Sequence, residues 1–294
     1  MALRPHLDSA LARVTGGRLG GRPPVVAVLR LAGVISAMPV RLRAAALNLA
    51  ELAAPIERAF AMPGVKAVAL AINSPGGSPV QAALIARRIR ALAEEKDVPV
   101  YAFAEDVAAS GGYWLACAAD EIYADPNSIV GSIGVVSAGF GFAELLQRIG
   151  VERRTHVQGD RKLLLDPFVP EKPEEVERLE AIQKDIYESF KDAVRERRGE
   201  RLAKRKSRVI FSGEVWTGKR ALELGLVDGL GDLRSVMRAR YGDEVRLRLV
   251  GARRSWVRRR LGLAGWEGGE PTGDWATSLL AAVEARGLWA RFGL

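Results

Sequence analysis

The sequence has few of the residues from which disulfides and metal sites are built. Its 294 residues include one cysteine, Cys117, and two histidines, His6 and His156. A single cysteine excludes an intrachain disulfide and a cysteine-based metal cluster, and two histidines are too few for the usual zinc sites. We therefore expect no metal, no cofactor and a reducing compartment.

Long apolar runs are also missing. No segment reaches the roughly 20 consecutive apolar residues that a membrane-spanning helix needs. The first 21 residues are interrupted by Arg4, Asp8, Arg13 and Arg18, so they lack the apolar stretch of a secretory signal. The predicted location is cytoplasmic, with peripheral contact to the inner membrane surface.

Positive charge is in excess and is unevenly distributed. The net charge is +9, and residues 253–260 alone contain five arginines. A solvated basic face and contact with anionic phospholipid both explain this cluster. The tryptophans interleaved with it and following it favour membrane contact through residues 253–289. No zinc-ligand set or nucleic-acid-binding motif accompanies the arginines, so nucleic acid is not an expected partner.

The order of apolar segments predicts an α/β core. Nearly continuous apolar runs at 25–31, 65–72 and 98–104 indicate buried strands, and helical spacing over 41–62 and 79–95 separates them. This alternation is typical of a sheet with both faces covered. Further helices are predicted over 172–199 and 215–224. The chain divides into a flexible lead-in (1–23), a core domain (24–240) and a basic, tryptophan-containing appendage (241–294).

Two glycine-rich turns follow predicted strands. Ser110 lies between small residues in Ala-Ser-Gly-Gly at 109–112, where a tight turn would expose its hydroxyl and aim backbone N–H groups at a developing oxyanion. A serine that merely caps a helix explains the same pattern. The motif Asn-Ser-Pro-Gly-Gly at 73–77 allows a close backbone approach to a bound peptide, or is an ordinary strand-to-helix turn.

A serine nucleophile needs a base, and the candidates are few. His6 lies in the lead-in, and His156 falls in a predicted strand over 151–157. Lys162 is the alternative, since three leucines follow it in an otherwise polar turn. A lysine base must be neutral near pH 7, which requires burial to lower its pKa by roughly 2–4 from about 10.4. Most lysines are surface residues, so composition leaves this choice open.

Four motifs in a fixed order resemble the signal peptide peptidase A (protease IV) family, especially its short SohB-like members. They are Asn-Ser-Pro-Gly-Gly at 73–77, Ala-Ser-Gly-Gly-Tyr at 109–113, Gly-Ser-Ile-Gly-Val at 131–135, and Gly-Asp-Arg-Lys at 159–162 followed by Asp-Pro-Phe at 166–168. A closing pattern over 215–228 matches as well, and the resemblance covers residues 25–235. It implies a crotonase/ClpP-like α/β superhelix of repeated strand–strand–helix units.

The same resemblance assigns roles to individual residues. Ser110 is the nucleophile that attacks the scissile carbonyl, and Lys162 is the general base that takes its proton. Ser132 matches the serine that orients the lysine, and Gly77 matches the glycine whose N–H lines the oxyanion hole. We add the N–H of Gly111, which directly follows the nucleophile, as a second oxyanion donor.

The resemblance predicts a serine endopeptidase with a Ser/Lys dyad that hydrolyses unfolded or membrane-derived peptides, such as signal-peptide remnants. It also predicts a homo-oligomeric ring in which Lys162 enters the site of a neighbouring subunit. Two alternatives share the fold: a crotonase-type acyl-CoA hydratase or isomerase, which needs a carboxylate at the reacting carbon, and an inactive membrane-associated scaffold. The intact Ser110, Ser132 and Lys162 disfavour both.

Overall fold

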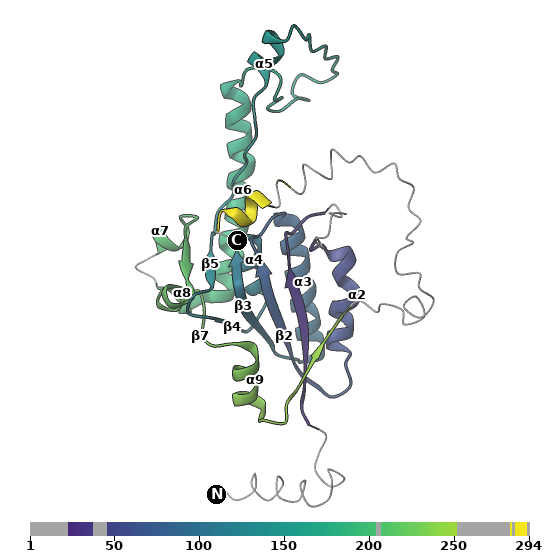
Figure 1. Cartoon of the computed structure of the whole chain (residues 1–294), viewed down its shortest axis with the longest axis vertical. Helices are drawn as coiled ribbons and strands as arrows, with labels where there is room; N and C mark the ends of the chain where they lie inside the picture. The colour runs from purple at the N-terminus through teal and green to yellow at the C-terminus, as the bar shows by residue number, and fades with distance from the viewer. Residues whose placement is uncertain (1–22, 38–45, 204–206, 252–282, 284–285, 293–294) are drawn as a thin grey trace, which may run out of the picture.

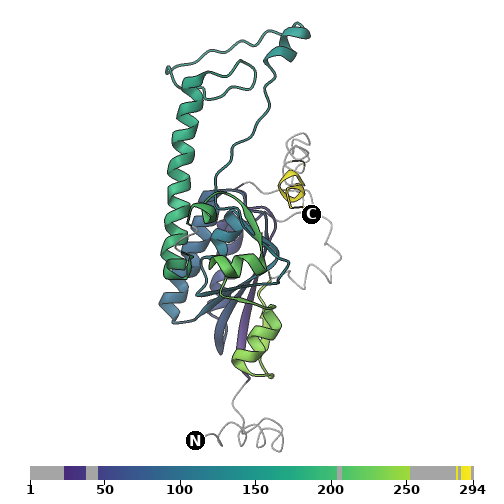
Figure 2. The ribbon, with the colours of Figure 1, turned by 90° about the vertical axis from the view of Figure 1, so that its left-hand side faces the viewer.

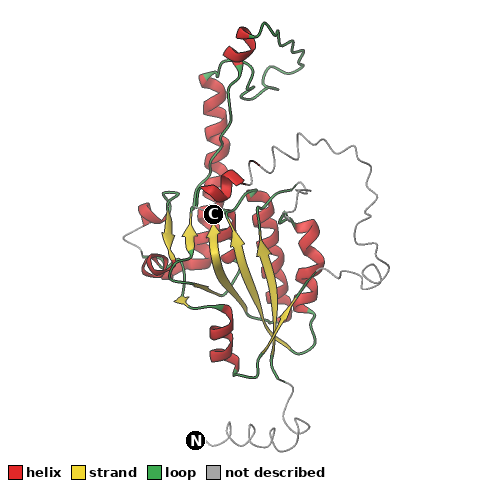
Figure 3. Ribbon diagram, viewed as in Figure 1, coloured by secondary structure: helices red, strands yellow, loops and turns green. Residues whose placement is uncertain are grey.

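A mostly parallel β-sheet forms the centre of the protein (Figures 1 and 3). The computed structural model describes residues 23–37, 46–203, 207–251, 283 and 286–292. The main path of the sheet runs β6-β5-β3-β2-β1-β8, and β4 and β7 form a branch from β3. Among the strands of the described residues, β5 and β6 alone pair antiparallel. The strands are β1 (Val25–Ala32), β2 (Val65–Ser74), β3 (Val100–Ala109), β4 (Glu121–Ala124), β5 (Ile129–Gly131), β6 (Val215–Thr217), β7 (Gly229–Leu230) and β8 (Arg246–Leu249).

Helices cover both faces of the sheet, which explains why most residues of its central strands are apolar and buried. The helices are α2 (Leu49–Phe60), α3 (Pro79–Lys96), α4 (Gly111–Ala116), α5 (Ala143–Arg148), α6 (Pro173–Arg198), α7 (Ser207–Ile210), α8 (Gly218–Leu224) and α9 (Leu233–Tyr241), with a short 3-10 turn at Gly199–Arg201. Along β1, Leu29 joins the large core under α2 and α3, whereas Val28 joins a smaller core that is closed by Met237 of α9. The period of two along the strand therefore divides one apolar run between two cores.

The strand β3 is shared by the two branches of the sheet. Its first half pairs with β4 and its second half with β5. At the division, the Asn73 side chain donates to Asp106 (2.6 Å) and accepts from the N–H of Val107 (3.2 Å). This bridge stabilises the register shift between β2 and β3. The carboxyl ends of β2, β3 and β5 consequently meet at one edge of the sheet, where open α/β sheets bind ligands.

An arm, defined here as residues 137–185, projects away from the sheet (Figures 1 and 2). It contains α5, the connection 149–172 and the first half of α6. No residue of α5 is buried, and Glu175 is the one buried residue in the part of α6 that lies within the arm. With 26 residues, α6 is roughly 39 Å long at 1.5 Å per residue. None of the helices in the described ranges combines the length and apolar character needed to cross a membrane.

The predicted α/β class is confirmed, because a mostly parallel sheet lies between helices on both of its faces. Two local predictions were wrong. Residues 151–157 form no strand, because they lie on the arm and pair with no neighbouring strand. Residues 215–217 are strand and not helix, because they pair with β5 before α8 begins.

The end of the sheet domain lies beyond the boundary predicted at residue 240. Residues 246–249 form β8, which pairs in parallel with β1 at the edge of the sheet. The domain therefore continues to Leu249. The lead-in up to residue 22 and the arginine cluster at 253–260 lie outside the described residues.

Candidate active site

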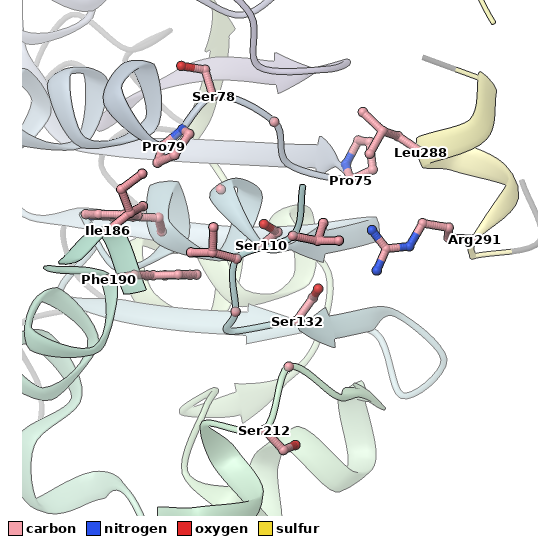
Figure 4. Close-up of a pocket in the computed structure, with 17 residues that line it drawn as sticks. Pro75, Ser78, Pro79, Ser110, Ser132, Ile186, Phe190, Ser212, Leu288 and Arg291 are labelled. Atoms are coloured by element: carbon pink, nitrogen blue, oxygen red, sulfur yellow. The ribbon is translucent and has the colours of Figure 1, made fainter. Parts of the chain in front are cut away.

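Ser110 occupies a strained turn between β3 and α4. Its φ of 53° and ψ of −123° are unfavourable for a residue with a side chain and cost about 1–3 kcal/mol. Backbone hydrogen bonds maintain the turn: the N–H of Ser110 donates to the Gly131 carbonyl (2.8 Å), and the Ser110 carbonyl accepts from Tyr113 (2.9 Å) and Trp114 (3.0 Å). The hydroxyl does not cap α4. It is therefore available at the surface of the cavity that Figure 4 shows.

The glycine turn after β2 packs directly against this serine. A Cβ on Gly76 would lie 2.7 Å from the Cβ of Ser110, and a Cβ on Gly77 would lie 2.1 Å from the Ile35 carbonyl oxygen. Both glycines also have positive φ, 103° and 133°. A side chain at position 76 would thus force the two turns apart, and one at position 77 would push the glycine turn away from Ile35. Within the described part of the chain, the N–H groups of Gly77 and Gly111 donate no hydrogen bond to the protein.

Ser132 follows β5 and reaches the same cavity. It also has a positive φ, 54°, and its N–H donates to the Glu214 carbonyl (2.7 Å). The residue is 8% exposed, and its side chain lies opposite Ser110 in Figure 4. Four of the five predicted site residues, Ser110, Ser132, Gly77 and Gly111, therefore line one cavity of about 430 Å³.

One wall of the cavity is apolar. The rings of Trp114 and Phe190 are stacked in parallel, with centroids 4.7 Å apart and an interplanar angle of 2°. Phe190 and Ile186, which also lines the cavity, come from the base of α6. Trp114, from α4, lines the cavity as well. The other lining residues were missed: Phe190, Ile186, Ser212, Gly213, Leu288 and Arg291. The sequence feature that pointed to one of them is Phe190, an isolated phenylalanine in the highly charged segment 172–199 that was predicted to be a helix.

Lys162 does not line the cavity. It belongs to the connection between α5 and α6, and Figure 2 shows that this connection runs at the end of the arm away from the sheet. The N–H of Lys162 donates to the Gly159 carbonyl (3.1 Å). Lys162 is exposed, and so is His156 in the same connection. A single chain therefore brings neither candidate base to Ser110. His6 lies outside the described residues.

The only cysteine is buried behind the site. Cys117 is 2% exposed and belongs to the hydrophobic core. Burial raises the pKa of its thiol to about 12, and burial also raises the pKa of the adjacent Tyr113 well above its ordinary value. A thiol with so high a pKa is a poor nucleophile at neutral pH. Among the described residues, no cluster of three or more His, Cys, Asp or Glu side chains could hold a metal ion.

Known proteins similar to this chain include several peptidases. The family model described as peptidase family S49 matches residues 92–245, a range that contains Ser110, Ser132 and Lys162. The chloroplastic serine protease SPPA of Arabidopsis thaliana is 37% identical over 76% of this chain and 33% of its own length. A Brucella abortus protein named Na(+)/H(+) antiporter NhaA is 49% identical over 98% of this chain and 39% of its own length.

The chain thus spans well under half of the length of these relatives. Among solved structures, a substrate-peptide complex of the 1510-N membrane-bound stomatin-specific protease is 14% identical, with a TM-score of 0.47, over 82% of this chain and 97% of that one. The family model covers more than half of the sequence, and its range includes Ser110 and Ser132. The chain belongs to peptidase family S49, as the four sequence motifs indicated.

Proposed function

We propose that the protein is a serine endopeptidase in which Ser110 is the nucleophile and Lys162 the general base. The main observation in support is the set of residues that line the cavity. Ser110, Ser132 and the N–H groups of Gly77 and Gly111 lie together at the carboxyl edge of the sheet. The strained backbone of Ser110 supports this role, because such strain is concentrated at functional sites.

The reaction follows from these groups. The Ser110 oxygen attacks the peptide carbonyl while the neutral Lys162 amine takes the hydroxyl proton. The oxyanion of the tetrahedral intermediate accepts hydrogen bonds from Gly77 and Gly111. The lysine ammonium, oriented by Ser132, then protonates the leaving amine. A water molecule activated by the same amine hydrolyses the acyl-enzyme and releases Ser110.

We propose further that Lys162 acts in the cavity of a neighbouring subunit within a homo-oligomeric ring. The placement of Lys162 on the projecting arm supports this arrangement, since none of the described residues that line the cavity is a histidine or a lysine. Apolar side chains on the arm also support it. Phe140, Leu145 and Ile149 are 82%, 52% and 60% exposed. Apolar residues gathered in this way mark interaction sites.

The proposed substrates are unfolded or membrane-derived peptides, including signal-peptide remnants. The apolar wall of Trp114, Phe190 and Ile186 suits an apolar side chain next to the scissile bond. We also propose that residues 253–289 bind the anionic inner surface of a membrane. This part of the proposal rests on the arginines and tryptophans of the sequence. Salt-sensitive binding to anionic vesicles, absent from a chain ending at residue 250, tests it.

Mixing two inactive variants tests the shared site. Ser110→Ala and Lys162→Ala subunits are each expected to be inactive, whereas co-assembled subunits should regain activity. In a random equal mixture about a quarter of the interfaces join an intact serine to an intact lysine, so about a quarter of the wild-type activity is expected. A fluorophosphonate probe should label Ser110 at these interfaces. If mixed assemblies, verified by two different tags, remain as inactive as either variant alone, the shared site is refuted.

A further inference from the structure

A second hollow adjoins the candidate active site and extends along the base of the arm. We call it the arm recess. It has a volume of about 340 Å³ and lies between α6 and the two segments 133–135 and 211–212. Gly134, Val135 and Ser212 line both the recess and the active-site cavity. The recess therefore opens directly beside Ser132, the residue proposed to orient the lysine.

The recess carries charges that are not paired within the chain. Glu180 and Lys184 line it from successive turns of α6, and both are exposed. In the described ranges neither side chain forms an ion pair, although neighbouring charges on the same helix do, as Lys191 and Glu188 show. The floor is less polar. It includes Val135, Tyr187 and Phe211, and the Tyr187 hydroxyl donates to the Phe211 carbonyl.

The loop around Lys162 has the complementary character. Asp160 and Arg161 are exposed and, among the described residues, form no ion pair, unlike the nearby Arg153 and Asp166. Leu163 and Leu164 are 38% and 40% exposed. A tight turn from Gly159 to Lys162 presents these residues together at the distal end of the arm.

We propose that the arm recess binds the 160–164 loop of a neighbouring subunit. This inference rests on the proposed shared site and names the surface that assembles it. The neighbouring subunit's Lys162 lies at Ser132 in this arrangement. The Cα atoms of the loop residues on either side lie within about 4–7 Å of the Lys162 Cα, because consecutive Cα atoms are 3.8 Å apart. They then enter the recess, where Glu180 faces the neighbouring subunit's Arg161 and Lys184 faces its Asp160. The leucines cover the apolar floor.

Charge reversal in the otherwise intact protein gives the first test. Glu180→Arg should lower kcat/KM about tenfold, because it places a positive charge opposite Arg161. Arg161→Glu should do the same, and the two substitutions together should restore most of the activity. Glu177→Arg is the matched control, since Glu177 is also exposed on α6 but does not line the recess. It should leave kcat/KM unchanged. A double variant no better than the single variants overturns the pairing.

The mixed assemblies give a sharper test. The Lys162→Ala subunit provides the serine and the recess of every complete site, and the Ser110→Ala subunit provides the loop. Glu180→Arg in the Lys162→Ala subunit should therefore lower the recovered activity about tenfold, and Arg161→Glu in the Ser110→Ala subunit should restore it. Glu180→Arg in the Ser110→Ala subunit should have no effect.

The outcomes separate the two proposals. If Glu180→Arg lowered the recovered activity equally in either subunit, Glu180 would act in folding or general assembly. That result would overturn the recess as the binding site of the loop. No loss in either subunit would also overturn it, while the shared site would stand. A parent mixture without activity would refute the shared site and the recess together.

Discussion

Position 77 requires glycine for two separate reasons, its backbone conformation and the lack of space for a side chain. Its φ is 133°, and a Cβ would lie 2.1 Å from the Ile35 carbonyl oxygen. The same carbonyl accepts a hydrogen bond from the N–H of Ser78 (2.8 Å), so it cannot move freely. The proposed oxyanion donor is thus positioned by backbone contacts, and a methyl group would displace it.

Gly77→Ala should therefore lower peptide hydrolysis at least 100-fold, the usual effect of losing one oxyanion donor. It should also reduce the free energy of unfolding by about 1–3 kcal/mol through backbone strain. Gly64→Ala is the control, because Gly64 also has a positive φ, 74°, but no atom lies within 4 Å of its added Cβ. It should lower stability without affecting kcat. Steady-state kinetics and urea unfolding of both variants measure these effects, and an active Gly77→Ala protein would contradict the assignment.

Lys162 and His156 lie on the same exposed connection, so substitution distinguishes between them. Lys162→Ala and Lys162→Arg should both be inactive, since a guanidinium does not deprotonate at any working pH. His156→Ala should keep most of the activity. Hydrolysis by the wild-type protein should rise towards alkaline pH, because the neutral amine is the active form. If His156→Ala were as inactive as Lys162→Ala, histidine would replace lysine as the base.

At the scale of elements, the base of α6 decides how the arm is held. Arg198, 2% exposed, forms two hydrogen bonds to Asp228, at 2.7 and 3.0 Å, and two more to the Gly225 carbonyl. Asp228 also accepts from the N–H of Ile122 at the start of the β4 branch. The closing motif at 225–228 therefore anchors the long helix and does not line the cavity.

Removing the buried arginine should be costly. Arg198→Ala removes four hydrogen bonds of a buried guanidinium and leaves the partly buried Asp228 with only its longer ion pair to Arg201 (3.5 Å). It should reduce the free energy of unfolding by about 3 kcal/mol. Arg195→Ala breaks an exposed ion pair with Asp192 on the same helix, and should cost less than about 1 kcal/mol. Urea unfolding followed by circular dichroism compares the two. A similar small loss in both variants would show that Arg198 does not anchor α6.

At the scale of the whole molecule, the burial of a thiol should make the free energy of unfolding fall as the pH rises into the alkaline range. The pKa of the Cys117 thiol is about 12 in the folded protein, against about 8.5 in an unfolded chain. The unfolded state therefore loses this proton first as the pH rises. The contribution of the protonated Cys117 thiol to the free energy of unfolding is complete below about pH 8.5 and is lost progressively towards pH 12.

Cys117→Ala should consequently flatten the decline of unfolding free energy above pH 8.5. Tyr113, whose pKa burial also raises, remains in the variant, so part of the decline should persist. Urea unfolding at several pH values from 7 to 11 measures the difference between the two proteins. Identical pH profiles for wild type and Cys117→Ala would show that the thiol titrates alike in the folded and unfolded states.

The sequence by itself indicated the central strands, the helix α6 and the two glycine-rich turns at 73–77 and 109–112. These features depend on neighbours in the chain: apolar runs for β1, β2 and β3, small residues around Ser110, and a charged helical period for α6. It did not determine the strand state of residues 215–217, because that state depends on pairing with β5, more than 80 positions away. Residues 151–157 have strand-like alternation, but the arm offers them no partner.

Only the tertiary structure decided what surrounds Ser110. Phe190, Ser212 and Arg291 reach the cavity from segments 80 or more positions away from that serine, and no local pattern records such contacts. The structure also decided that Lys162 lies on the arm and not in the cavity of its own chain. The physical reason is the same in each case. Periodicity and turn chemistry act over a few residues, whereas the direction of a 26-residue helix depends on the packing at its base.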